Sequence, residues 1–394
     1  EVFELIFTSG TTGNPKGVML AHDAVLAGVA SFHRIINPME HRLVSLLPLS
    51  HLLEQAVSLF YALEVGAHVL YVRSRSPRVI FAALNEHQAT SMLLVPQVVE
   101  LFWNAVEREV EKRGQTARFN RLRRIARHLP MPMRRLVFRS VHAQLGGSLR
   151  LFATAGAFLP PALQQAWEDL GVIVLQGYGA TETSAGCCTT MDDHPLGCVG
   201  WPPAPVKMRI TDGGEIEFGG PTLFKGYWDD PAATADAFTP DGWYRSGDLG
   251  ALDERGRLHL HGRKKDIIVL PNGFNVFPED IENALRVAGI GDSVVLETRP
   301  GRIEAVVLAP AGHRTAGDPD DEASGTAEDA RRGTIGDAVK AANATLGPNQ
   351  RIVGWRLWPE ADFPRTHTFK VKRDRVRAWA AADQALPVAQ GDHA

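Results

Sequence analysis

The 394-residue sequence is poor in cysteine. It has three, Cys187, Cys188 and Cys198, and their spacing is not that of a zinc site. An odd and sparse set of this kind is also a poor disulfide framework. The count argues against a disulfide-rich secreted scaffold and favours a reducing, cytoplasmic setting.

The sequence also lacks a long hydrophobic run. No stretch reaches the ~18 uninterrupted apolar residues that a spanning helix requires, because His51, Glu54, Glu64 and His68 interrupt the most apolar region, residues 44–72. No signal peptide opens the chain. It begins at Glu1 rather than Met, and its first six residues are typical of a buried strand, which needs neighbours. We therefore expect that upstream sequence is missing.

A strong excess of one charge is absent as well. The 42 Lys and Arg residues nearly balance the 45 Asp and Glu residues, giving a formal net charge of −3. This balance argues against a chain-wide nucleic-acid binder, although a local basic patch remains compatible with it.

Such a local patch lies in residues 107–139, which are strongly basic and read as helical. The patch has four closely spaced arginines above a predicted apolar helical face: Arg121, Arg123, Arg124 and Arg127 over Phe119, Leu122, Ala126 and Leu129. A solvated helical surface is the simpler interpretation, and peripheral membrane contact is the alternative.

What is present is an ordinary globular composition, 44% hydrophobic and 22% charged, in a chain long enough for two or three domains. Short apolar runs alternate with helix-like segments. The runs are residues 4–8, 43–47, 69–72, 92–95, 151–154 and 172–175. This alternation predicts a large mixed α/β domain with a largely parallel sheet.

The pattern changes after residue 210, where short β-like pieces are separated by Gly, Asp and Pro and predict an antiparallel, β-rich subdomain. The large domain is expected to span residues 1–264, and a small, mobile α+β domain residues 265–394. Within the small domain, residues 311–333 are rich in Asp, Glu, Ala, Gly and Thr and predict a flexible, solvated insertion.

The strongest local signal is TSGTTGNPKG at residues 8–17. Its glycines let the backbone approach an anion, its hydroxyls and amides donate hydrogen bonds to phosphate, and Lys16 adds a positive charge. Pro15 precedes the lysine, so the motif is not the P-loop NTPase pattern. A flexible turn is the plainer alternative, but ten ordered positions argue against it.

Three further motifs follow in order: QGYGATET at 176–183, YRSGDLG at 244–250 and GRKKD at 262–266. Tyr178 offers a flat ring for stacking, and Glu182 offers oxygen ligands suited to Mg²⁺. Taken alone, Glu182 is as compatible with a capping carboxylate, and Asp248 with a common Ser-Gly-Asp turn.

In this order the motifs resemble those of the adenylate-forming superfamily, which includes acyl-CoA synthetases, luciferases and peptide-synthetase adenylation domains. The resemblance extends from Thr8 to Lys370. It implies that the loop holds the β- and γ-phosphates of ATP through Thr8, Ser9, Gly10, Thr11, Thr12, Gly13 and Lys16.

The same resemblance assigns the other nucleotide contacts. Tyr178, between Gly177 and Gly179, would face adenine, and Thr181 the α-phosphate region. Glu182, together with Thr8, would bind Mg²⁺. Asp248 would bind the ribose. Arg263, whose charge is permanent, would contact the ribose and phosphate side of the nucleotide.

In the small domain, the resemblance makes Lys265 the hinge position. Gly273 opens the segment GFNVFPEDIE, similar to the loop used in thioester formation, where glycine lets backbone pass close to a narrow pantetheine channel. Lys370, at the end of PRTHTFK, would be the catalytic lysine that stabilises negative charge during adenylation. Phe369 stands where many relatives have Gly.

The acid-binding residues are assigned in the same way. The segment LPLSHLLEQ at 47–55 resembles one that lines the acid pocket, where His51 gates the carboxylate or is simply a satisfied core histidine. Ala155, Gly156 and Ala157 correspond to a strand end of small residues that shapes the acyl and adenine pockets. The long basic insertion at 100–149 resembles that of long-chain acyl-CoA synthetases.

The implied function is ATP-dependent activation of a long-chain fatty acid to acyl-AMP, followed by thioester formation with CoA, with Mg²⁺ as cofactor and no nucleic-acid partner. The implied location is cytoplasmic, with peripheral membrane contact through residues 107–139 left open. Two alternatives remain: a fatty acyl-AMP ligase that delivers the acyl group to a carrier protein, and a non-catalytic nucleotide- or acyl-binding relative.

Overall fold

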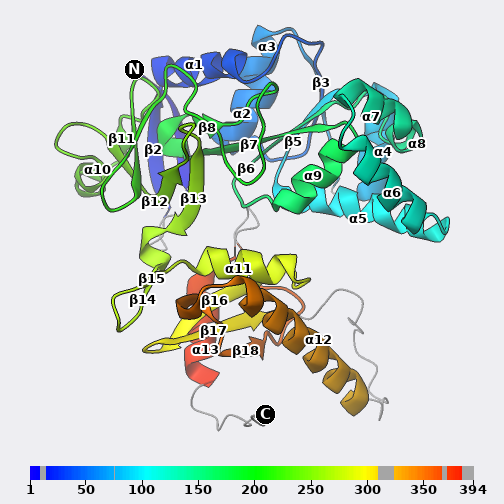
Figure 1. Ribbon diagram of the computed structural model, residues 1–394. Helices are drawn as coiled ribbons and strands as arrows, with labels where there is room; N and C mark the ends of the chain where they lie inside the picture. The colour runs from blue at the N-terminus through cyan, green and yellow to red at the C-terminus, as the bar shows by residue number, and fades with distance from the viewer. Residues whose placement is uncertain (9–14, 75, 309–323, 366–370, 384–394) are drawn as a thin grey trace. The chain divides into compact units, whose positions relative to one another are not determined.

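The computed structural model describes residues 1–8, 15–74, 76–308, 324–365 and 371–383. The chain forms two compact units, Glu1–Leu260 and His261–Ala394. Figure 1 labels the elements of each unit. The sequence placed the boundary close by, between residues 264 and 265.

A six-stranded sheet organises the large unit, in the order β4-β3-β5-β6-β7-β8. Its strands are β3 (Arg42–Ser45), β4 (His68–Tyr71), β5 (Ser91–Leu94), β6 (Leu151–Ala155), β7 (Ile173–Gly179) and β8 (Gly186–Cys188). Neighbours are parallel from β4 to β7, and β8 runs antiparallel to β7. The predicted α/β domain with a largely parallel sheet is confirmed.

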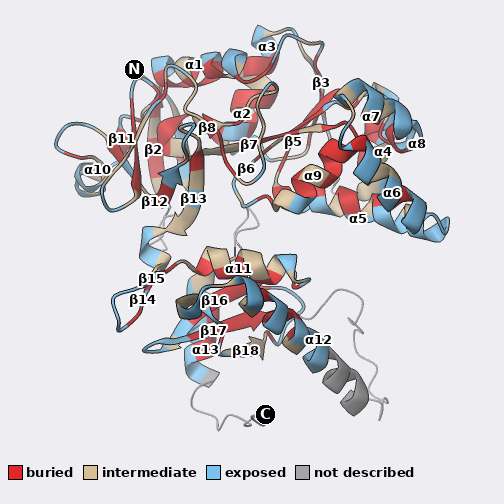
Figure 2. Ribbon diagram, viewed as in Figure 1, coloured by how far each residue is buried: buried red, intermediate tan, exposed pale blue. Residues whose placement is uncertain are grey.

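Helical segments precede or connect these strands, and several of them carry buried residues (Figure 2). They are α1 (His22–Ser31), η1 (Phe32–Arg34), α2 (Leu52–Gln55), the π-helix η2 (Ala56–Tyr61), α3 (Ala62–Glu64), α4 (Pro77–His87), α5 (Pro96–Lys112), α6 (Thr116–Ala126), α7 (Met131–Val137), α8 (Arg139–Gln144) and α9 (Pro161–Asp169). Trp167 of α9 centres one core, with its ring 5.0 Å from Phe152 and 5.7 Å from Trp103.

Two smaller sheets complete the large unit, in the orders β1-β2-β11 and β13-β12-β10-β9. Their elements are β1 (Val2–Thr8), β2 (Lys16–Ala21), β9 (Lys207–Ile210), β10 (Glu215–Gly219), β11 (Gly226–Tyr227), β12 (Tyr244–Leu252) and β13 (Leu258–Arg263), with η3 (Thr181–Thr183) and α10 (Pro231–Ala237). β10 is antiparallel to both β9 and β12. The predicted β-rich subdomain is therefore present.

The small unit is α+β, with a sheet in the order β16-β17-β18. Its elements are η4 (Lys264–Asp266), β14 (Ile268–Val269), β15 (Asn275–Val276), α11 (Pro278–Val287), β16 (Ser293–Arg299), β17 (Arg302–Val307), α12 (Ser324–Thr345), η5 (Pro348–Gln350), β18 (Gly354–Leu357) and α13 (Arg373–Asp383). Ile281 and Leu285 of α11 and Ile335 of α12 are buried in one core with the sheet.

Helix α12 departs from the flexible insertion expected at residues 311–333, because its backbone is helical from residue 324 onward. A polar composition predicts exposure to solvent, but it does not predict irregular backbone. Ala, Glu and Arg favour helix, and the helix continues to buried Ile335, Val339 and Ala342 at helical spacing. The remainder of the expected insertion, residues 311–323, lies outside the described residues.

In the basic insertion, Arg121, Arg124 and Arg127 are exposed, as a solvated helical surface requires, and Arg123 is half-buried. Arg123 and Arg127 both form ion pairs with Asp169 of α9, at 3.3 and 3.0 Å, and the Asp169 side chain is fully buried. Only Arg121 and Arg124 of the four remain as exposed side chains without an ion pair among the described residues. None of the helices in the described ranges combines the length and apolar character that crossing a membrane requires.

Candidate functional site

The described ends of the predicted phosphate loop lie next to each other. β1 and β2 pair in antiparallel register, and Thr8 is opposite Lys16. The candidate residues Ser9, Gly10, Thr11, Thr12 and Gly13 lie outside the described residues. The hairpin thus brings the first hydroxyl and the lysine of the motif to the same end of a small sheet.

Tyr227 links this hairpin to Glu182. It lies on β11, opposite Val18 of β2. The Lys16 Nζ atom is 4.7 Å from the centre of the Tyr227 ring, a cation–π distance. The Tyr227 hydroxyl donates a hydrogen bond to Glu182 Oε1 at 2.9 Å. Burial, with the Glu182 charge adding to it, raises the pKa of Tyr227, so the phenol stays a neutral donor.

The backbone around Glu182 is fixed by local hydrogen bonds. The Ala180 amide donates to Thr183 Oγ1 at 3.1 Å, and the Phe224 amide donates to the Glu182 carbonyl oxygen at 2.8 Å. The Glu182 side chain is buried, with 9% of the residue exposed. Its carboxylate forms no ion pair within the described part of the chain.

These features bear on whether Mg²⁺ fits here. Among the described residues, no group of three or more His, Cys, Asp or Glu side chains could hold a metal. Mg²⁺ is commonly bound by one or two carboxylates together with substrate phosphates. An oriented carboxylate that pairs with no basic side chain among the described residues, and that Tyr227 links to Lys16 of the loop hairpin, suits such a shared site.

A second hydrogen-bonded pair joins two other predicted residues. The Tyr178 hydroxyl on β7 donates to Asp248 Oδ2 on β12 at 2.8 Å. Burial, aided by the Asp248 charge, raises the pKa of Tyr178 well above its ordinary value, so it too remains a neutral donor. Ser246 Oγ accepts from the Asp248 amide at 3.0 Å and donates to the Ile216 carbonyl at 2.7 Å. The turn therefore holds the carboxylate in place.

The remaining large-unit residues cluster where β6 and β7 end. Ala155 pairs with Gly177 across the two parallel strands, and Ala157 follows two residues later. Gly156 has φ +85°, which disfavours any side chain. Gly179 closes β7, and Thr181 begins η3. Ligands of open α/β sheets bind beyond the carboxyl ends of the strands, and this edge holds the candidate residues together.

His51 lies at the start of helix α2. It caps helix α2 in extended conformation, and its carbonyl oxygen accepts from the Gln55 amide at 3.1 Å. The backbone of His51 therefore has a structural role, and its contact with an acid stays a prediction.

The other candidate residues lie in the small unit, which begins at His261 within β13. Arg263 ends β13, and Lys265 is exposed in η4. Gly273, with φ +79°, forms the turn of the β14–β15 hairpin, where its amide donates to the Leu270 carbonyl at 2.8 Å. Lys370 lies outside the described residues.

Sequence reasoning missed Tyr227. The residue follows Gly226 in an unremarkable stretch, and its importance depends on the pairing of β11 with β2. The only available signal was an aromatic residue between the second and third motifs, which is too common to assign a role.

Comparison with known proteins agrees with this geometry. Residues 1–228 match the profile of the family described as AMP-binding enzyme. Long-chain-fatty-acid–CoA ligase FadD15 of Mycobacterium bovis is 32% identical, over 96% of this chain and 68% of its own length. Human long-chain-fatty-acid–CoA ligase 1 is also 32% identical, over 71% of this chain and 43% of its length.

Solved structures of similar fold include adenylate-forming enzymes. The crystal structure of ATP-bound MatB from Rhodopseudomonas palustris superposes with a TM-score of 0.71 at 26% identity, covering 97% of this chain and 68% of that one. The profile match spans more than half of the chain, and the mycobacterial relative aligns along nearly all of it. The chain therefore belongs to the AMP-binding enzyme family.

Proposed function

We propose that this chain activates a long-chain fatty acid with ATP, forming acyl-AMP and pyrophosphate, and then transfers the acyl group to CoA. The observation that carries the proposal is the linked set Lys16–Tyr227–Glu182, in the unit that also holds the Tyr178–Asp248 pair. The long-chain choice is supported by relatives that are 32% identical and named as long-chain-fatty-acid–CoA ligases.

In the first step, a carboxylate oxygen of the fatty acid forms a bond to the α-phosphorus of ATP while the bond to the bridging oxygen of pyrophosphate breaks. The carboxylate is already nucleophilic, so the protein supplies position and charge neutralisation. Lys16 and the loop bind the β- and γ-phosphates, and Asp248 accepts hydrogen bonds from the ribose. Lys370 stabilises negative charge at the α-phosphate.

Mg²⁺ in this site would neutralise phosphate charge, with Glu182 and Thr8 as its protein ligands. Tyr227 would then act as a positioning residue, because its hydroxyl fixes one oxygen of Glu182. Tyr178 would present its ring to adenine while its hydroxyl orients Asp248.

In the second step, the CoA thiolate attacks the acyl carbonyl and AMP leaves with the bonding electrons. The small domain turns about Lys265, which withdraws Lys370 and presents the Gly273 loop to the pantetheine arm. Arg263 contacts the ribose and phosphate side of the nucleotide. His51 and Ala155 line the acid pocket.

The test measures pyrophosphate release by the full-length protein with MgATP and a panel of carboxylates, with and without CoA. We expect release with a palmitate-class acid, enhancement by CoA, and loss of release in Lys370→Ala. Lys372→Ala is the matched control, since Lys372 is a nearby exposed lysine. Release without CoA turnover would indicate a carrier-protein acceptor. No release with any acid would indicate a non-catalytic binding protein.

A further inference from the structure

The insertion between β5 and β6 has an extreme local charge. Residues 112–150 contain eleven Lys and Arg residues and no Asp or Glu, although the whole chain carries a net charge of −3. The eleven are Lys112, Arg113, Arg118, Arg121, Arg123, Arg124, Arg127, Arg134, Arg135, Arg139 and Arg150. Such a field attracts anions.

Some of these arginines bind groups of the protein itself. Arg123 and Arg127 pair with buried Asp169. Arg134 of α7 donates to the carbonyl oxygens of Leu129 and Glu168 at 2.7 and 2.9 Å. Its neighbour Arg135 donates to the carbonyl oxygen of Leu149. Both arginines of α7 are thus directed toward backbone carbonyls.

The surface that α7 leaves to solvent is consequently apolar. Leu136 is 69% exposed, Met133 51% and Val137 39%, and Ile125 on neighbouring α6 is 53% exposed. Figure 2 colours residues of α6 and α7 as exposed (pale blue). Arg118, Arg121, Arg124 and Arg139, on α6 and at the start of α8, are exposed and form no ion pair with any described residue.

A groove lies beside these groups, and Arg118 and Val137 belong to its lining. It has a volume of ≈ 190 Å³ and lies between the α5–α6 segment and the α7–α8 segment. Arg113 and Arg118 line it together with Val110, Leu122 and Val137. Arg113 is paired with Glu109 of the same lining at 2.7 Å, whereas Arg118 forms no ion pair with any described residue. The Arg118 guanidinium and apolar side chains therefore open onto the same hollow of the surface.

We propose that this surface, formed by α6, α7 and the groove beside them, docks on a bilayer containing anionic phospholipid. Guanidinium groups bind phosphate headgroups strongly, and exposed apolar side chains insert at the boundary between headgroups and acyl chains. A nucleic acid would use the charges but would leave Leu136 and Met133 without a function. The membrane contact rests on Arg118, Arg121, Arg124 and Arg139 and does not depend on the proposed reaction.

The first arm of the test is co-sedimentation of the full-length protein with phosphatidylcholine vesicles that contain or lack phosphatidylglycerol. We expect binding only with phosphatidylglycerol, weakened by salt because the exposed charges are screened. Arg121→Gln with Arg124→Gln should weaken binding roughly 30-fold. Lys207→Gln with Arg255→Gln removes two exposed charges elsewhere on the large unit and should leave binding unchanged.

The second arm tests the apolar part of the surface. Leu136→Ser should weaken vesicle binding about tenfold, whereas Leu63→Ser, at a leucine 74% exposed, should not. Equal losses in the control variants, or no dependence on phosphatidylglycerol, would overturn the proposal. A third result would also overturn it: binding to both heparin and vesicles that depends on the arginines but does not change in Leu136→Ser. The surface would then recognise polyanions in general.

Discussion

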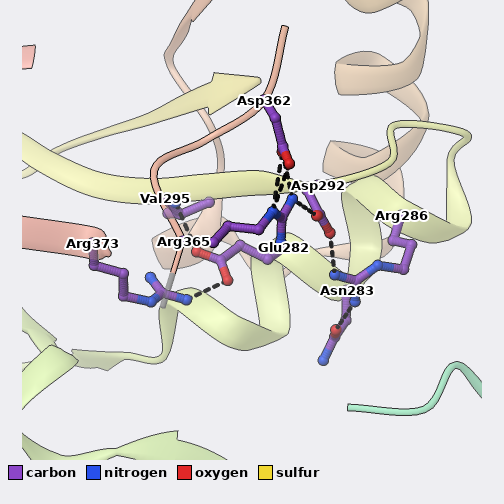
Figure 3. A network of polar contacts seen from close by, with 8 residues as sticks. All are labelled: Glu282, Asn283, Arg286, Asp292, Val295, Asp362, Arg365 and Arg373. Atoms are coloured by element: carbon purple, nitrogen blue, oxygen red, sulfur yellow. Dashed lines mark hydrogen bonds and ion pairs between the residues drawn. The ribbon is translucent and has the colours of Figure 1, made fainter. Parts of the chain in front are cut away.

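Carboxylates are held in different ways in the two units. At the candidate nucleotide site of the large unit, Glu182 accepts from the Tyr227 hydroxyl and Asp248 from the Tyr178 hydroxyl. In the small unit, Glu282 faces the guanidinium of Arg373 (Figure 3). A phenol orients a carboxylate and leaves its charge in place, whereas a guanidinium cancels that charge.

The small-unit network is built to join elements. Glu282 on α11 accepts from the Val295 amide on β16 at 2.8 Å and pairs with Arg373 at the start of α13. Burial raises the pKa of Glu282, and the Arg373 charge opposes that rise. Arg365 pairs with Asp292 at 2.5 Å and with Asp362 at 2.7 Å. The carboxylates of Glu282, Asp292 and Asp362 bind arginine or backbone groups of the small unit, which indicates a structural role.

The largest expected effect follows from breaking the guanidinium pair. Glu282→Gln removes the hydrogen-bonded counter-charge of the largely buried Arg373 and leaves the weaker Coulombic attraction of Glu279 and Asp266, which should destabilise the small unit by roughly 3 kcal/mol. Hydrogen exchange of the β16 amides should report the loss, while ATP affinity stays unchanged. Glu360→Gln, at an exposed residue of the same unit, is the control. Unchanged hydrogen exchange in Glu282→Gln would show that Glu282 is not needed for the stability of the small unit.

The opposite result is expected at the phenol-held carboxylate. Glu182→Gln keeps an oxygen that can accept from Tyr227, so the free energy of unfolding should change little. Loss of the charge should lower the rate of pyrophosphate release roughly 100- to 1000-fold and raise the Mg²⁺ concentration needed for half-maximal rate. Glu86→Gln, on the exposed side of α4, serves as the control. A stability loss without a rate loss would make Glu182 another structural carboxylate.

Local sequence patterns predicted much of the large unit. Short apolar runs between helical segments specify buried parallel strands. The motifs containing Lys16, Tyr178, Glu182 and Asp248 were assigned their chemistry through their order and their resemblance to the adenylate-forming superfamily, because residue type alone left Glu182 and Asp248 open. What links these residues could not be predicted. Tyr227 donates a hydrogen bond to Glu182, which lies 45 positions earlier in the chain. No local sequence pattern encodes a pairing over that separation.

Long-range pairing also hid the partner of two arginines. Arg123 is half-buried, and both Arg123 and the exposed Arg127 form ion pairs with Asp169, which lies on another helix about forty residues later along the chain. Sequence periodicity does not indicate so distant a partner. The start of helix α12 was missed for another reason. A polar composition predicts exposure to solvent, but residues such as Ala, Glu and Arg favour a helical backbone even where they are exposed.

Glu168 shows a third way of holding a carboxyl group, in which the group is buried and protonated. Replacing it is expected to give the smallest harmful effect of the three carboxyl substitutions. It is buried in α9 of the large unit and accepts from the Gln164 side-chain amide at 3.0 Å. Burial raises the pKa of Glu168 from 4.5 to about 7. The folded protein therefore holds a proton here that the unfolded chain releases above its lower pKa. Stability from this group is complete below about pH 4.5 and is lost as the pH rises through about 7.

Glu168→Gln should abolish that part of the pH dependence, because the amide is neutral at every pH. Above about pH 7, the variant should be more stable than the native protein by roughly 3 kcal/mol, the cost of ionising a group with this pKa shift. Urea unfolding followed by tryptophan fluorescence would measure it, since Trp167 adjoins the site. Exposed Glu107→Gln is the control. If both variants keep the native pH slope, then Glu168 is ionised in the fold, and neutral partners hold a buried charge here as the phenol does at Glu182.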